Sequence, residues 1–155
     1  MAIQICVPKE VRKDEQRVAL VPDIVNRLTK TGLSINIETS AGELVGYTDK
    51  EYADANIVSD PAKLLGSADI TLMVNPPTAE QISQLREGSI LIGYLDPFSN
   101  LEKFNQLNAR KISAFSVEMI PRISRAQAMD ALSSQASIAG YKAVLIGSNI
   151  LGKFL

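Results

Sequence analysis

Residues 121–134 bring together side chains whose chemistry suits the binding of a polar ligand. The segment contains two arginines, a glutamine, an aspartate and three serines. A guanidinium can hold a carboxylate or carboxamide oxygen through two hydrogen bonds, and a glutamine amide can both donate and accept. The segment therefore predicts a site for a ligand that presents donors as well as acceptors.

The same segment predicts the start of a long helix over residues 125–155. Ser124 followed three positions later by Gln127 has the spacing of a capping box. Polar residues then recur every three or four positions on one face: Gln127, Asp130, Ser134, Ser137 and Tyr141. A roughly opposite face is apolar or small: Met129, Leu132, Ala136, Ala139, Ala143, Ile146 and Ile150. This pattern fits a helix between a core and a ligand cleft, or more simply a capped helix with one solvated face.

Alternating apolar runs and helical patterns indicate the fold that would position this helix. The expected strands are residues 3–7, 33–38, 70–74, 89–94 and 112–116. The expected helices are residues 22–31, 61–66, 79–86 and 101–110, with a short one at 49–55. Such alternation predicts an α/β fold with a doubly wound, mostly parallel sheet, Rossmann-like or flavodoxin-like, that ends in the long C-terminal helix.

Three loops are expected to meet at the carboxyl edge of this sheet, where open parallel sheets bind ligands. The loop after the first strand carries Lys9, Glu10, Glu15 and Arg17. The loop after the run at 70–74 carries Asn75, and the loop after the last strand contains residues 122–130. Arg122 and Arg17 should therefore lie near each other.

Composition excludes several classes of function. The chain has 155 residues and a formal net charge of −1, so it lacks the basic excess of a nucleic-acid-binding protein. It has no histidine and a single cysteine, Cys6, which rules out a histidine-based triad, common zinc sites and an internal disulfide. No apolar run approaches the ~18 residues that span a bilayer, so we expect no direct membrane insertion. A reducing, cytoplasmic-type compartment fits these features.

Two blocks resemble a known family. Residues 121–141, PRISRAQAMDALSSQASIAGY, are similar to a signature segment of the alpha subunits of proton-translocating NAD(P) transhydrogenases. Looser versions occur in the alanine dehydrogenase family. A second block, residues 8–10 with residues 15–22, agrees with the first. The resemblance runs from about residue 7 to the end, and it covers only the first lobe of the family's NAD(H)-binding unit.

The resemblance implies which residues contact the cofactor. Arg122, Gln127 and Asp130 fall on positions that contact the nicotinamide and its ribose, and Ser133 would add a hydrogen-bonding group. The alternative is that Arg122 and Asp130 form an ion pair that fixes the loop. The implied activity is hydride transfer between NAD(H) here and NADP(H) on a beta subunit, coupled to proton movement through a membrane domain. The implied location is the cytoplasmic side of the inner membrane, in a complex where this chain forms homo-oligomers.

The chain is expected to be a partial enzyme. The family continues into a second lobe with a glycine-rich fingerprint, but Gly140, Gly147 and Gly152 do not match G-x-G-x-x-G. We therefore predict an α/β lobe at residues 1–124 and a linker helix at 125–155 that leads toward an absent dinucleotide-binding lobe. NAD(H) would be shared with that second lobe.

Two other functions remain open. A lobe of an alanine- or saccharopine-type amino-acid dehydrogenase would use Arg17 for the substrate carboxylate. That family, however, places a lysine at the position of Asn75 and a histidine at that of Asp96. A non-catalytic α/β interaction module is the third reading.

Overall fold

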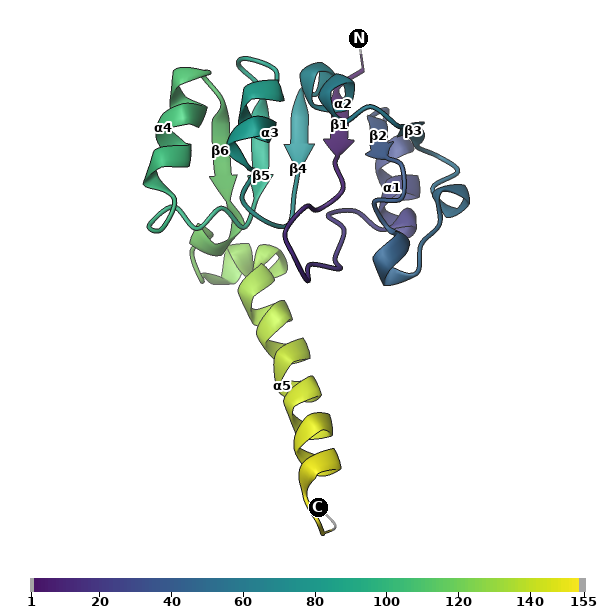
Figure 1. Cartoon of the computed structure of the whole chain (residues 1–155), viewed down its shortest axis with the longest axis vertical. Helices are drawn as coiled ribbons and strands as arrows, with labels where there is room; N and C mark the ends of the chain where they lie inside the picture. The colour runs from purple at the N-terminus through teal and green to yellow at the C-terminus, as the bar shows by residue number, and fades with distance from the viewer. Residues whose placement is uncertain (1, 154–155) are drawn as a thin grey trace. The chain divides into compact units, whose positions relative to one another are not determined.

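A computed structural model describes residues 2–153, and over this range the chain contains one six-stranded sheet with every pair parallel (Figure 1). The strands are β1 (Gln4–Val7), β2 (Ser34–Glu38), β3 (Asn56–Val58), β4 (Ile70–Leu72), β5 (Ile90–Gly93) and β6 (Ser113–Ser116). Their order is β3-β2-β1-β4-β5-β6, so the chain reverses direction across the sheet between β1 and β4. The predicted doubly wound sheet is confirmed.

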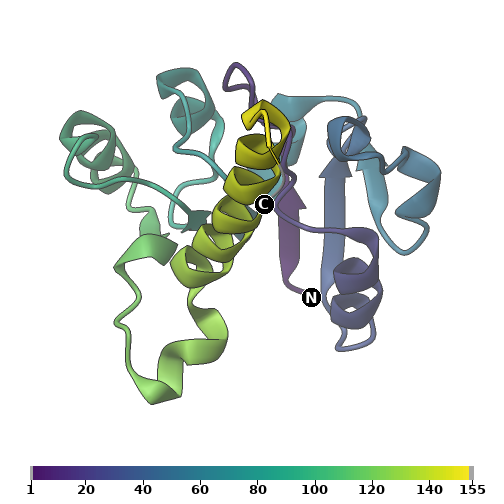
Figure 2. The same ribbon diagram turned by 90° about the horizontal axis from the view of Figure 1, so that it is seen from below.

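Helices cover both faces of the sheet. They are α1 (Pro22–Thr29), α2 (Pro61–Ser67), α3 (Ala79–Gln84) and α4 (Leu101–Ala109), and α5 (Ala131–Ile150) follows the sheet in sequence. Short 3-10 helices lie at η1 (Glu43–Val45), η2 (Asp49–Glu51), η3 (Val117–Met119) and η4 (Ser124–Met129). One face carries α1, and the other carries α2, α3 and α4 (Figure 2).

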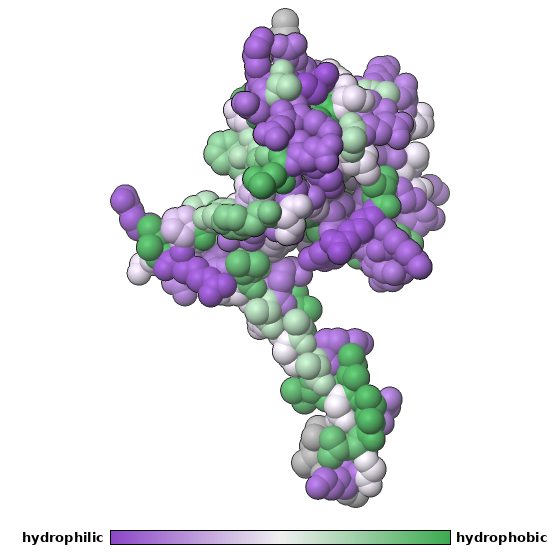
Figure 3. Space-filling view, turned by 60° about the vertical axis from the view of Figure 1, so that its left-hand side comes forward, coloured by the Kyte–Doolittle hydropathy of each residue, from purple (hydrophilic) through white to green (hydrophobic). Residues whose placement is uncertain are grey.

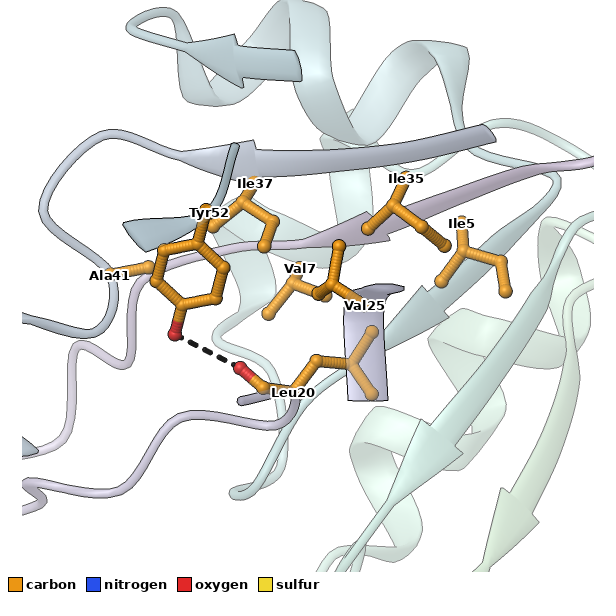
Figure 4. Close-up of a cluster of buried hydrophobic side chains, with 8 residues drawn as sticks. All are labelled: Ile5, Val7, Leu20, Val25, Ile35, Ile37, Ala41 and Tyr52. Carbon is orange, nitrogen blue, oxygen red and sulfur yellow. Dashed lines mark hydrogen bonds between the residues drawn. The ribbon is translucent and has the colours of Figure 1, made fainter. Parts of the chain in front are cut away.

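The buried core divides between the two faces because alternate side chains of a strand point to opposite sides. On the α1 face, β1 and β2 pack against α1 through a cluster that includes Ile5, Val25 and Ile35 (Figure 4). The Tyr52 hydroxyl closes this cluster by donating to the Leu20 carbonyl at 3.0 Å. Burial raises the pKa of Tyr52 to about 12, so this donor keeps its proton.

The second core packs β4, β5 and β6 against α2, α3 and α4. Gly93 is required there: a Cβ at this position would lie 2.4 Å from the carbonyl oxygen of Met73, the residue that follows β4. The seam between the two halves of the sheet is short. Only Ile5↔Ile70 and Cys6↔Thr71 are paired between β1 and β4 in the described chain.

Most predicted elements are confirmed within a few residues, with two corrections. β3 was missed because its three residues are too short a run to give a pattern. The final α-helix spans Ala131–Ile150, so its predicted start at residue 125 and its predicted course through 151–153 are wrong. The last two predicted positions, 154 and 155, lie outside the described residues. Cys6 is fully buried, as expected, and burial raises the pKa of its thiol.

Two compact units share the described residues, one up to Ser116 and the other from Val117 onward. In the second unit, α5 is long and apolar, and none of its residues is buried. Val144, Leu145 and Ile146 are 61%, 46% and 50% exposed, and Figure 3 shows apolar side chains gathered on this helix. Within residues 2–153, no helix is long and apolar enough to cross a lipid bilayer.

Candidate functional site

The loop after β1 is fastened to the end of β4 by the carboxylate of Glu10. Glu10 Oε1 accepts the backbone N–H of Val74 at 2.6 Å, and Oε2 accepts the backbone N–H of Asn75 at 3.1 Å. Two consecutive amides therefore hold one carboxylate, an arrangement typical of anion binding by backbone donors. The predicted meeting of these two loops at the carboxyl edge is confirmed.

Asn75 is the centre of a hydrogen-bond network at this edge. Its side-chain Nδ2 donates to Glu10 Oε2 at 3.0 Å and to Glu15 Oε2 at 2.8 Å. Its Oδ1 accepts from Arg12 Nη1 at 3.1 Å. Asn75 is only 7% exposed, so its polar groups need these partners in place of water. One neutral amide thus joins two carboxylates and a guanidinium.

Arg17 is held by Glu15 over an aromatic ring. Glu15 accepts from Arg17 Nε at 2.8 Å and from Nη2 at 2.7 Å, and it also accepts the Arg17 backbone N–H at 2.9 Å. The guanidinium lies 6.0 Å from the centroid of the Tyr94 ring. The hydrogen bond with Arg17, helped by that from Asn75, lowers the pKa of Glu15 to about 2, so Glu15 is ionised near neutrality.

A groove of about 560 Å³ opens beside this network. It is lined by polar side chains of both charges, including Glu10, Arg12, Asp96 and Lys103, around Asn75. Asp96 adopts a left-handed backbone with φ 46°, which non-glycine residues rarely do. Sequence reasoning missed Arg12 and Tyr94, although Arg12 lies in the loop that it singled out.

In the second unit, the predicted capping box at Ser124 and Gln127 is wrong. Ser124 begins the 3-10 helix η4, whose N-cap residue is Ile123 and has no side-chain cap. The α-helix begins later, because Asp130 Oδ1 accepts the N–H of Ser133 at 2.9 Å and its Oδ2 accepts the Ser133 hydroxyl at 2.6 Å. A carboxylate accepts these bonds more strongly than a serine hydroxyl would. Gln127 therefore precedes the α-helix and does not lie on its polar face.

The structure brings only part of the predicted cofactor-binding set into contact. Asp130 and Ser133 are hydrogen-bonded to each other, whereas Arg122 and Gln127 are exposed. The Ser133 bonds hold the pKa of Asp130 below its usual value, and Arg122 adds a weaker electrostatic contribution. Among the described residues no ion pair within 4.0 Å joins Arg122 to Asp130, so the simple loop-fixing pair is not formed. The convergence of Arg122 with Arg17 stays a prediction.

Comparisons with known proteins agree with this architecture. The NAD(P) transhydrogenase subunit alpha of Haemophilus influenzae is 37% identical over 150 residues, which cover 97% of this chain and 29% of that protein. The crystal structure of transhydrogenase from Sinorhizobium meliloti superposes with a TM-score of 0.92 at 35% identity, covering 97% of this chain and 45% of that one. Alanine dehydrogenase of Bacillus subtilis is more distant, at 32% identity over 96% of this chain and 39% of that protein.

This chain therefore spans less than half the length of each of these relatives. The family model described as the alanine dehydrogenase/PNT N-terminal domain matches residues 6–139. That match includes the sheet except for the first two residues of β1, both loops of the Asn75 network and the start of α5. The chain belongs to the alanine dehydrogenase/PNT N-terminal domain family, and within that family it is more similar to transhydrogenase subunit alpha than to alanine dehydrogenase.

Proposed function

We propose that this chain is the first lobe of the NAD(H)-binding component of a proton-translocating NAD(P) transhydrogenase. The observation that carries the proposal is similarity over nearly the whole chain to transhydrogenase subunit alpha, in sequence and in fold. The activity is hydride transfer between NAD(H) and NADP(H). A nicotinamide supplies that chemistry when bound, and the protein has to position the ring.

The residues assigned to this task are Arg122, Gln127, Asp130 and Ser133. The exposed guanidinium of Arg122 and the exposed amide of Gln127 suit a carboxamide, which has both a donor and an acceptor. The Asp130 carboxylate, ordered by Ser133, suits ribose hydroxyls, which donate hydrogen bonds. This donor set fits the nicotinamide half of NAD(H), and a second lobe would hold the remainder.

The network around Asn75 favours transhydrogenation over amino-acid oxidation. Glu15 already engages Arg17, so that arginine is paired with a carboxylate of its own chain. The lysine and histidine of the alanine dehydrogenase pattern are replaced by Asn75 and Asp96. Hydride transfer between two nicotinamides needs no proton donor at the reacting carbon, so the loss of histidine is compatible with it.

The remaining assignments concern the assembly. The partners are a second NAD-binding lobe, a beta subunit that binds NADP(H), a membrane domain and a second copy of this chain. The complex would place this lobe on the cytoplasmic side of the inner membrane. Support comes from the relatives, which are named as subunits of a transhydrogenase.

A substitution of Arg122 tests the proposal in the assembled enzyme. Arg122→Ala should slow hydride transfer by about 10-fold or more, because a bidentate positioning contact is lost. Arg125→Ala is the matched control, since Arg125 is also an exposed arginine of the same segment. Transfer is followed by reduction of an NAD analogue by NADPH. Equal rates for the two variants would contradict the assigned role of Arg122, and NAD-dependent oxidation of alanine would favour the dehydrogenase alternative.

A further inference from the structure

The crevice between β1 and β4 is the place where a fold of this type usually binds its ligand. The strand order β3-β2-β1-β4-β5-β6 reverses between these two strands. In dinucleotide-binding sheets with this order, the pyrophosphate lies at that reversal, held by backbone N–H groups of the first loop. The loop after β1, residues 8–21, contains no glycine, so it lacks the residues that let a phosphate approach the backbone closely.

Glu10 occupies this crevice in the way that a bound anion would. Its two carboxylate oxygens take the consecutive N–H groups of Val74 and Asn75, and the Asn75 side chain adds a third donor. These are the donors that the end of β4 offers toward the reversal point. Val74 and Asn75 are only 8% and 7% exposed, so water does not compete freely for them.

A second carboxylate of the lobe is engaged in the same manner. Glu38 is the last residue of β2, and its Oε2 accepts the backbone N–H of Lys9 at 2.8 Å. In dinucleotide-binding folds an acidic residue downstream of the first loop holds a ribose hydroxyl. In this lobe the acidic residue, Glu38, instead accepts a hydrogen bond from the first loop itself. Two carboxylates of the lobe are therefore bound to backbone amides at the carboxyl edge of the sheet.

We propose that Glu10 is a built-in anion that occupies the backbone amides at the end of β4 and excludes phosphate groups from them. Glu10 thereby determines specificity: these amides offer no cradle for a pyrophosphate, and other surfaces of the lobe are left for the uncharged nicotinamide. The consequence for NAD(H) rests on the proposed function. The occupation of the amides by Glu10 does not, and it is tested without any nucleotide.

Chemical rescue in the isolated chain tests the proposal. Glu10→Ala removes the carboxylate and leaves its three donors, so sodium acetate should bind in its place. Two-dimensional amide NMR should show saturable shifts of the Val74 and Asn75 signals in this variant on titration with acetate or inorganic phosphate. At ten times its dissociation constant, acetate should also raise the melting temperature of the variant by about 4 °C relative to chloride at equal ionic strength.

Three controls make the outcome decisive. The unaltered chain should show neither the shifts nor the rescue, because Glu10 occupies the donors. Glu10→Gln should lose stability, because its amide NH2 faces N–H donors and cannot accept from them, but it should show no rescue by acetate, because its side chain still fills the space that acetate would take. Glu102→Ala, which removes an exposed glutamate of α4, should show no acetate-specific stabilisation.

Two results would overturn the proposal. One is saturable movement of the Val74 and Asn75 amides in the unaltered chain on addition of phosphate. The other is the absence of acetate binding in Glu10→Ala. If that variant is unfolded in chloride, the same titration is read as acetate-dependent folding, and failure to recover structure in acetate counts against the proposal. Failure of hydride transfer in the assembled enzyme would leave these readouts unchanged.

Discussion

Replacing Asn75 by alanine tests how strongly one amide holds two loops together. The substitution deletes the bonds of 3.0 Å to Glu10 and 2.8 Å to Glu15, and it removes the acceptor for Arg12. Hydrogen bonds to charged groups contribute roughly 1.5–3 kcal/mol each. Glu10 and Glu15 are half-buried, whereas Arg12 is exposed and can turn to water. Counting roughly 1.5 kcal/mol for each carboxylate bond and nothing for Arg12 gives a loss of about 3 kcal/mol.

Equilibrium unfolding in urea measures this loss directly. For a chain of this size, about 3 kcal/mol corresponds to a fall in melting temperature of roughly 6–12 °C. Asn108→Ala is the matched control, because Asn108 is an exposed asparagine on α4 and should change stability by less than ~0.5 kcal/mol. The pKa of Glu15, followed by carboxyl NMR, should rise in Asn75→Ala but stay below its usual value, because Arg17 makes the larger contribution. If Asn75→Ala has the same free energy of unfolding as Asn108→Ala, the hydrogen bonds of Asn75 do not hold the two loops together.

Three further predictions follow from packing, charge and exposure. Because its pKa is lowered from 4.5 to about 2, Glu15 should stabilise the fold fully above pH 4.5 and lose that effect as pH falls toward 2; a stability difference from Glu15→Gln that does not vary between pH 5 and pH 2 would count against this. Gly93→Ala should cost about 1–3 kcal/mol in urea unfolding, because its Cβ would overlap the Met73 carbonyl, and stability equal to the unaltered chain would contradict that overlap. Light scattering should show concentration-dependent association of the chain through α5, reduced in Leu145→Glu, whereas identical masses for both chains would show that α5 is not the contact.

The sequence predicted the sheet and the meeting of its loops because both follow from local patterns. Apolar runs alternate with helix signals, such as the proline at the start of α1, and this alternation indicates a parallel sheet. Parallel strands all have their carboxyl ends at the same edge of the sheet. The approach of the first loop to Asn75 followed from that rule alone. The choice of Glu10 as the residue bound to the β4 amides did not, because several acidic residues of the loop have the same chemistry.

The start of the last helix was mistaken because the prediction relied on the capping-box spacing of Ser124 and Gln127 and did not consider Asp130 as a cap. Aspartate is also a preferred N-cap residue, and spacing alone does not show which side chain forms the cap. The structure places a 3-10 helix at the first candidate and the α-helix at the second. As a result, Gln127 does not lie on the polar face that was predicted for the helix, whereas Asp130 and Ser133 are hydrogen-bonded to each other.

The short seam between β1 and β4 has a consequence for how the amides at its end exchange with solvent. Backbone pairing between β1 and β4 ends after Cys6↔Thr71, whereas each of the other neighbouring strand pairs is registered over three or four residues. Beyond the end of that pairing, the Glu10 carboxylate accepts the backbone N–H groups of Val74 and Asn75, so a side chain replaces the backbone as their hydrogen-bond acceptor. The amide hydrogens of Val74 and Asn75 are therefore protected by a side chain and should exchange with solvent faster in Glu10→Ala than in the unaltered chain. The Glu10 carboxylate thus closes the end of the seam, while Ile70 and Leu72 of β4, which pack against the cluster of β1 and β2, keep the two halves of the sheet together.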